Sequence, residues 1–263
     1  MSDQNLPSLL YLWDKRTVYI GPLFEPLSLS QGAATLILSL NKPVRFKTET
    51  MIEAIECRSL LLPAGFAVTI DTGDALVVNC NLDALGEDFF RLSGNMTHQQ
   101  DDALYQIQHE ADFISQFHRI YSNQLTSDSA LKAVNQIFEE HIHHPERPFI
   151  PDQRISNVID VIKATVDDNL SVEDLAQSVN LSVPRLVQLF KQQTGVPIRR
   201  YRLWHRLFVA ATQMAKGESM TTAAMTAGFT DSSHLSHTFR SMFGMKPSLM
   251  LQQPNKIKLL TDQ

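Results

Sequence analysis

Short hydrophobic segments separated by turn-forming residues occupy the chain from Gln31 to Asp83. Val, Ile, Leu, Phe and Thr concentrate in the segments 34–40, 44–57, 59–62, 66–71 and 75–80, which is typical of β-strands. The triplets at 41–43, 63–65 and 72–74 contain the Pro, Gly, Asn and Asp that turns require. Short strands at near-regular spacing predict a small antiparallel barrel or sandwich, and we assign residues 1–98 to this β-rich, barrel-like domain.

The hydrophobic period changes after Met96, where apolar residues recur every three or four positions. This spacing predicts two amphipathic helices within residues 99–145, separated by a turn at 122–129. Two interpretations of these helices stay open: they pack on the barrel, or they pair with the same helices of a second subunit. The predicted stripes are Leu104, Ile107, Ala111, Ile114, Phe117 and Tyr121 on the first helix, and Leu131, Val134, Ile137, Phe138 and Ile142 on the second.

Histidines 141, 143 and 144 end the second predicted helix. Clustered histidines can bind a metal, but no Cys or carboxylate completes a ligand set there, so we interpret them as a solvated helix end and expect no metal. Three prolines between 145 and 151 then indicate an extended linker, assigned to residues 146–153.

Residues 154–251 have helical periodicity, and a tail of 252–263 follows. We predict helices near 154–167, 172–179, 183–193, 197–215, 220–226, 232–242 and 247–251. Ser171 and Ser182 are candidate N-caps, whereas Gly195, Gly217 and Gly244 are candidate helix stops.

Two segments of this region carry the residue pattern of a helix-turn-helix. That motif needs a small residue where its helices cross and a residue that tolerates left-handed backbone at the turn. Ala176 and Asn180 meet these needs in 170–195, and Ala224 and Gly228 repeat the same spacing in 220–244. Because a long predicted helix joins the two segments, they form a more specific signal than one motif alone. The expected apolar anchors are Leu181, Leu186, Leu189 and Phe190, then Phe229, Leu235, Phe239 and Phe243.

The charge distribution and the length of the joining helix both suit double-stranded DNA. Residues 1–150 contain 10 Lys and Arg against 19 Asp and Glu, whereas residues 151–263 contain 13 against 9. Only the second half is therefore suited to a polyanion. A helix over 197–216 spans about 30 Å, close to the roughly 34 Å of one turn of B-DNA. Two recognition helices would thus reach successive major grooves.

The candidate DNA-binding residues lie on the faces that the predicted anchors leave exposed. Arg185 and Gln188 have the hydrogen-bonding geometry for guanine and adenine edges, so we expect the first unit to read sequence and the second to anchor the backbone. A local capping or packing role for His234 and His237 stays open. The complete set is Ser182, Pro184, Arg185, Val187, Gln188 and Lys191 on the first unit, Ser232, Ser233, His234, Ser236, His237 and Arg240 on the second, and Arg199, Arg200 and Arg206 on the joining helix.

The region 170–251 resembles the DNA-binding domain of the arabinose-regulator (AraC/XylS) family. The matching segments are Leu-Ser-Val-Glu-Asp-Leu-Ala at 170–176, Leu-Phe-Lys-Gln-Gln-Thr-Gly at 189–195 and Gly-Phe-Thr-Asp-Ser-Ser-His-Leu-Ser-His-Thr-Phe-Arg at 228–240. Gln188 and His237 depart from the family by replacing Arg, and Lys246 departs by replacing Ser or Thr. The resemblance implies a transcription activator that contacts RNA polymerase and forms a homodimer. It also implies an N-terminal cupin-like barrel that senses an effector.

A small-molecule effector is expected in the apolar mouth of the barrel, near Phe46, Ile55, Phe66 and Ile70. An alternative is a regulator controlled by a protein partner or by abundance, and a remote one is a barrel enzyme with a helical appendage. No nucleophile–base pair supports the enzyme, and residues 31–97 contain no histidine for a catalytic metal. We therefore expect no enzymatic activity and no cofactor.

The remaining features predict a cytoplasmic protein. The two cysteines, Cys57 and Cys80, lie in apolar surroundings and are expected to be buried thiols in a reducing compartment. The first residues lack a secretory signal, and no apolar run approaches the roughly 18 residues of a membrane span.

Overall fold

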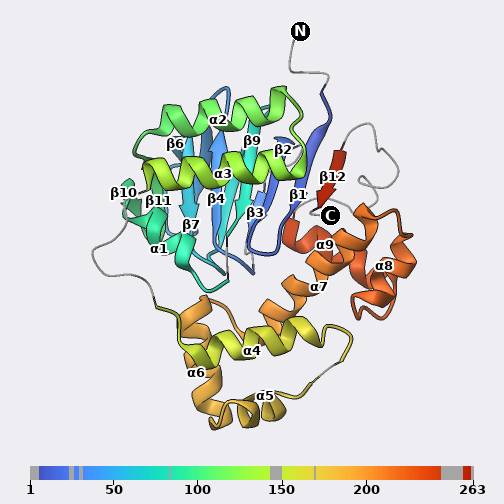
Figure 1. Cartoon of the computed structure of the whole chain (residues 1–263). Coiled ribbons are helices and arrows are strands. Elements are labelled where there is room, and N and C mark those ends of the chain that lie inside the picture. The colour runs from blue at the N-terminus through green and yellow to red at the C-terminus, as the bar shows by residue number, and fades with distance from the viewer. Residues whose placement is uncertain are drawn as a thin grey trace.

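The computed structural model describes residues 6–23, 27–29, 32–82, 84–142, 150–168, 170–243 and 257–261. In these ranges the N-terminal domain has two β-sheets, with α2 and α3 across one of them (Figure 1). The larger sheet has the strand order β10-β11-β7-β4-β9-β2-β1-β12, and the smaller has β3-β8-β5-β6. The strands are β1 (Ser8–Leu12), β2 (Thr17–Pro22), β3 (Leu27–Leu29), β4 (Thr35–Ser39), β5 (Val44–Lys47), β6 (Ile55–Cys57), β7 (Ser59–Leu62), β8 (Val68–Asp71), β9 (Leu76–Asn81), β10 (Met96–Gln100), β11 (Ala103–Ile107) and β12 (Ile257–Thr261).

The predicted β-rich domain is confirmed as two sheets that share a core rather than one closed barrel. Ile37 and Val77 of the larger sheet and Phe46 and Ile70 of the smaller sheet belong to one buried cluster. The predicted strand 44–57 is two strands, because 48–54 turns between β5 and β6. The pattern also missed β1, β2, β3, β10, β11 and β12. β1, which is buried at every position, lacks the alternation that marks a half-buried strand.

Helices α2 (Glu110–Ser122) and α3 (Ser127–His141) cover the outer face of the larger sheet. Phe113 and Phe117 of α2 and Val134 and Phe138 of α3 are buried in a cluster with residues of β1, β2, β4 and β9. The two helical stripes therefore pack on the sheet of their own chain. The prediction that the first helix includes Leu104 and Ile107 is wrong, because these residues lie on β11, which pairs with β10 and β7.

The C-terminal region is helical where the sequence predicts helices. The helices are α4 (Gln153–Ala164), α5 (Val172–Ser178), α6 (Val183–Thr194), α7 (Ile198–Ala215), α8 (Met220–Thr226) and α9 (Ser232–Phe243). A short helix α1 (Glu87–Ser93) in the N-terminal domain was not predicted. The predicted segment 247–251 and Gly244 lie outside the described residues. Within the described ranges, none of the helices combines the length and apolar character needed to cross a bilayer.

The two halves of the C-terminal region are buried in two different hydrophobic clusters. The first half, α4 to the start of α7, has its own buried cluster that includes Ile155, Leu175 and Phe190. The second half, from Leu207 to Phe239, shares the core that lies between the two sheets. The segment predicted only as a tail adds strand β12, which pairs in parallel with β1 and contacts α7.

Candidate nucleic-acid interface

The first helix-turn-helix, α5 and α6, has the local geometry that the sequence predicts. Ser171 accepts a hydrogen bond from the backbone N–H of Asp174 at 3.0 Å, and the Ser171 backbone N–H donates to the Asp174 carboxylate at 3.1 Å. This capping box fixes the start of α5. At the turn, Asn180 has a φ of 54°, in the left-handed region that Asn tolerates. The two helices are therefore held by a defined cap and a defined turn.

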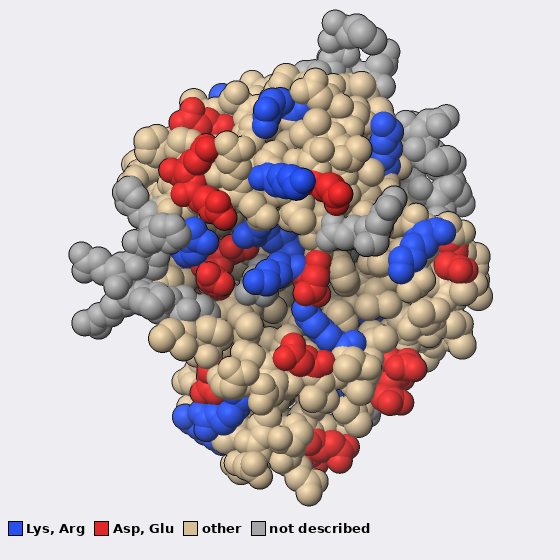
Figure 2. Space-filling view, in the orientation of Figure 1, with Lys and Arg blue, Asp and Glu red and all other residues tan. Residues whose placement is uncertain are grey.

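Helix α6 buries its predicted anchors and exposes its predicted DNA face. Leu186, Leu189 and Phe190 are buried, whereas the set Ser182, Pro184, Arg185, Val187, Gln188 and Lys191 is exposed. Val187 is 42% exposed although it is apolar, and such a side chain suits a thymine methyl group. Figure 2 shows Lys and Arg side chains over the part of the surface where α6 lies.

Arg185 and Gln188 lie side by side on this face. The Arg185 guanidinium donates a hydrogen bond to Gln188 Oε1 at 3.1 Å. Nearby, the Arg154 guanidinium binds the Asp152 carboxylate at 2.7 Å. The Arg154 hydrogen bond lowers the pKa of Asp152 to about 2, and Arg185 contributes to the same shift. The exposed face of α6 thus carries the cations Arg185 and Lys191, with the hydrogen-bonded pair of Arg185 and Gln188 side by side on it.

The second unit, α8 and α9, repeats the arrangement with closer packing. Ser219 accepts a hydrogen bond from the Thr222 backbone N–H at 3.1 Å and so caps α8. Gly228 takes the turn with a φ of 74°. A Cβ atom at Gly228 would lie 2.8 Å from the Val166 carbonyl oxygen, so the residue has no room for a side chain. The turn therefore requires Gly for both backbone conformation and space.

Helix α9 buries Leu235 and Phe239 as predicted. Among the candidate DNA-binding residues, Ser233, His234 and His237 are exposed, whereas Ser232 and Ser236 are half-buried. The side chain of the candidate Arg240 and that of the anchor Phe243 lie outside the described residues.

His234 is fixed by its neighbours, as one of the two interpretations held. Its backbone N–H donates to Asp231 Oδ1 at 2.7 Å, its ring Nδ1 lies 3.1 Å from Thr230 Oγ1, and the ring packs edge-on against Phe229 at 5.2 Å between centroids. The residue is nevertheless exposed to solvent. A local packing role and a DNA contact are therefore compatible for this residue.

The three candidate DNA-binding arginines of α7 occupy different environments. Arg199 is exposed, Arg200 is half-buried, and Arg206 donates from Nε to the Val166 carbonyl oxygen at 3.3 Å. Arg206 also packs against Gly228, since a Cβ there would lie 3.3 Å from the guanidinium carbon. Arg206 thus braces the segment between α4 and α5 against the turn of the second unit. With 18 residues, α7 spans about 27 Å.

The residues predicted for an effector are brought together in the core. Phe46 pairs across the smaller sheet with Ile55 on one side and Ile70 on the other, and Phe66 packs against the same cluster. Phe46 and Ile70 are fully buried. The predicted burial of the cysteines is confirmed, and desolvation raises the pKa of both Cys57 and Cys80 to about 12, which leaves them as inert thiols.

Two features of the described residues were not predicted. One is a cavity between the two domains, lined in part by Lys15, Lys163 and Trp204. The other is a cluster of His109, Asp112 and His141, whose potential ligand atoms lie within 4.8 Å of one another. The Asp112 carboxylate lies 3.8 Å from His109 Nδ1 and 3.9 Å from His141 Nε2. Both features join residues far apart in the sequence, so local pattern does not indicate them.

Comparison with known proteins places these observations in a family. Residues 175–253 match a family described as "Helix-turn-helix domain". The Transcriptional activator RhrA of Rhizobium meliloti (strain 1021) is 35% identical over 106 residues, covering 37% of this chain and 33% of the relative. The HTH-type transcriptional activator RhaS of Escherichia coli O139:H28 is 37% identical over 81 residues, covering 30% and 29%. The chain thus aligns with about a third of each of these relatives.

The whole fold also resembles solved structures. ToxT from Vibrio cholerae O395 superposes with a TM-score of 0.59 at 15% identity, covering 90% of this chain and 96% of that one. A ToxT structure bound to an unsaturated fatty acid gives a TM-score of 0.56 at 14% identity, with 90% and 94% covered. The arrangement of a β-rich N-terminal domain and a helical C-terminal region is therefore shared with ToxT over most of both chains. The C-terminal region therefore matches a helix-turn-helix family and is similar to two proteins named as transcriptional activators, in agreement with the sequence resemblance.

Proposed function

We propose that this protein is a sequence-specific transcription activator that places α6 and α9 in successive major grooves of promoter DNA. The observation that carries the proposal is the pair of helix-turn-helix units with buried anchors and exposed polar faces at the two ends of α7. The similarity to RhrA and RhaS, both named as transcriptional activators, supports activation over repression.

A salt-dependent DNA-binding titration of the full chain tests this function. DNA from the region upstream of its own gene is compared with a scrambled duplex of the same composition. We expect a preference of about 10³ or more for the natural sequence, and a steep loss of affinity with salt. Equal affinity for both duplexes at every salt concentration would contradict sequence-specific recognition, because phosphate contacts alone do not discriminate.

We further propose that the N-terminal domain senses a small-molecule effector. The bound fatty acid in the ToxT structure supports this, because the two chains share their fold over most of their length. Pairing of subunits and contact with RNA polymerase follow from the family resemblance. Since α2 and α3 use their apolar stripes within one chain, a dimer would use another surface, and sedimentation of the full chain with and without DNA measures it. Control by a protein partner is the alternative that a failure of effector binding would favour.

A further inference from the structure

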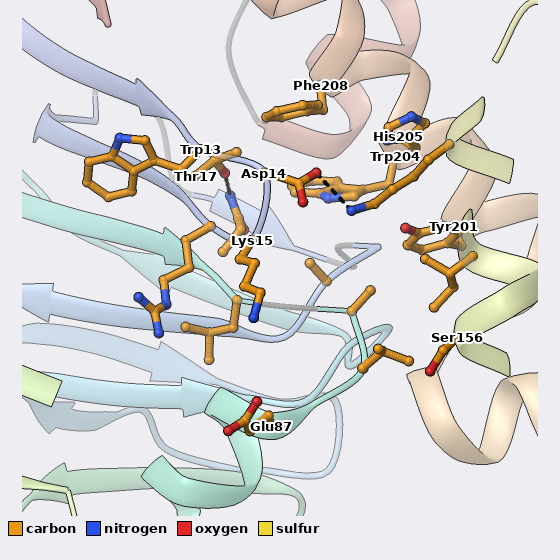
Figure 3. A pocket seen from close by; sticks show the side chains of 18 of the residues that line it. Trp13, Asp14, Lys15, Thr17, Glu87, Ser156, Tyr201, Trp204, His205 and Phe208 are labelled. Carbon is orange, nitrogen blue, oxygen red and sulfur yellow. Dashed lines mark hydrogen bonds and ion pairs between the residues drawn. The ribbon is translucent and has the colours of Figure 1, made fainter. Parts of the chain in front are cut away.

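A cavity of about 380 Å³ lies between the two domains, away from the exposed faces of α6 and α9. One wall comes from the turn between β1 and β2 and from the residues before α1, and the other comes from α4 and α7 (Figure 3). Its volume lies within the range of small-molecule sites, roughly 300–1,000 Å³. Any molecule held there would contact both the predicted sensor domain and the helix that joins the DNA-binding units.

The walls of the cavity include broad apolar surfaces. Trp204 and Phe208 of α7 are half-buried and line the cavity, and Trp13 and Tyr201 contribute further aromatic surface. Gly32 keeps this wall close to the sheet, because a Cβ there would lie 2.8 Å from Trp204 Cβ. Such walls favour a ligand with an apolar body.

Four charged residues around the cavity form two ion pairs with each other. Asp14 and Lys163 form an ion pair of 2.8 Å across the domain boundary. Arg16 binds Asp88 at 2.5 Å and 2.7 Å through two nitrogens. His205 adds no charge at neutral pH, because burial and the nearby Lys163 lower its pKa. These groups hold the walls together rather than offering a free charge to a ligand.

The cavity lining also includes charged side chains of both signs that are outside these ion pairs. Lys15, Glu87 and Asp160 line the cavity and are exposed, and none of them forms an ion pair with another residue of the described ranges. Figure 3 shows the Lys15 side chain extending into the space between the walls, with Glu87 on the same side. A site with a free ammonium, free carboxylates and aromatic walls is complementary to a molecule that carries both charges on an apolar body.

We propose that this cavity is the effector site and that it binds a zwitterion with an apolar side chain, of the class of the apolar amino acids. This inference rests on the proposed function. Lys15 binds the ligand carboxylate, Glu87 and Asp160 attract its ammonium, and the aromatic wall of α7 covers its side chain. Because the ligand contacts α4 and α7 as well as the sheet, it stabilises one arrangement of the two domains. DNA affinity then depends on ligand by linkage.

The test is isothermal titration calorimetry of the full chain without DNA. Apolar L-amino acids are titrated singly, and the tightest is compared with two analogues of the same body, one without the carboxylate and one without the ammonium. For L-phenylalanine these are 2-phenylethylamine and 3-phenylpropionate. We expect each analogue to bind about tenfold or more weakly, since each loses one charge-assisted contact.

Two variants separate the contacts. Lys15→Gln is expected to weaken the amino acid and the carboxylate analogue but not the amine. Glu87→Gln is expected to weaken the amino acid and the amine but not the carboxylate analogue. Lys47→Gln, on β5 and outside the cavity lining, is the matched control and is expected to change nothing.

Two results would overturn the proposal: no heat from any apolar amino acid at millimolar concentration, or equal affinity for the amino acid and one analogue. The DNA titration described above runs separately on the same protein. A chain that discriminates its upstream DNA but binds no amino acid refutes the effector assignment alone. One that binds the amino acid without reading DNA refutes the proposed function.

Discussion

The two helix-turn-helix units have the same motif but different attachments to the rest of the molecule. The first, α5–α6, closes on a core of its own and meets the N-terminal domain through partly buried residues such as Ala64 and Leu85. The second, α8–α9, is part of the core that lies between the β-sheets, and α9 contacts β3. The repeated motif thus gives one unit with a core of its own and one that shares the core of the N-terminal domain.

This difference predicts how the molecule unfolds. Phe190 of α6 and Phe239 of α9 are equally buried, so Phe190→Ala and Phe239→Ala should each cost about 3–5 kcal/mol of stability. Only Phe239→Ala should also speed hydrogen exchange in β4, β7 and β9, because its core is shared with the sheets. Exchange measured by peptide mass spectrometry checks this. Equal loosening of the sheets by both variants would show that the two units do not differ in attachment.

The turn of the second unit provides the next largest effect. In Gly228→Ala the new Cβ meets the Val166 carbonyl at 2.8 Å, and the residue must keep a φ of 74°. We expect a loss of about 2–4 kcal/mol, of which the left-handed backbone alone accounts for about 1–2 kcal/mol. Gly217→Ala is the control, because its φ is also positive but nothing lies within 4 Å. Urea unfolding curves compare the two, and equal losses would remove the steric argument.

DNA recognition should divide between base reading and backbone anchoring. Arg185→Ala is expected to reduce affinity for the natural site by about 1–3 kcal/mol, with little change on scrambled DNA, because it removes a base contact. Arg199→Ala, at the exposed start of α7, should weaken both duplexes alike and reduce the salt slope by about 1. Competition titrations at several salt concentrations measure both quantities. Uniform loss in Arg185→Ala would assign that residue to phosphate instead.

The sequence predicts the C-terminal domain better than the N-terminal one, for a physical reason. The helices of 153–243 are amphipathic and begin or end at caps such as Ser171 and Gly195. Residues near each helix end therefore determine its boundaries. By contrast, β1 and all but the last residue of β2 are buried. Without alternation they are indistinguishable from other apolar runs, and β12 owes its position to a pairing with β1 more than 240 residues earlier.

The candidate site shows the same limit. Exposure of Arg185 and Gln188 follows from helical period, and the structure agrees. The bracing role of Arg206 depends on Val166 and Gly228, which are distant in sequence, so composition alone assigned it to DNA phosphate. The interdomain cavity likewise joins the β1–β2 turn to α7. Contacts of this kind form only when distant segments pack together, so the spacing of residues along the chain does not predict them.

The smallest expected effect concerns His205 of α7, which lines the cavity between the two domains. Burial lowers the pKa of His205 below its usual 6.5, so the unfolded chain binds a proton more readily than the folded one. Stability should therefore rise with pH up to about 6.5 and then level off for this residue. His205→Gln should flatten that rise by less than about 1 kcal/mol in urea unfolding between pH 5 and 7.5. His98→Gln, an exposed control on β10, should leave the slope unchanged. If both variants retain the wild-type slope, His205 remains accessible to protons in the folded state. The surface between the first unit and the N-terminal domain would then be wetter than the core that the second unit shares with the sheets, which sharpens the contrast between the two.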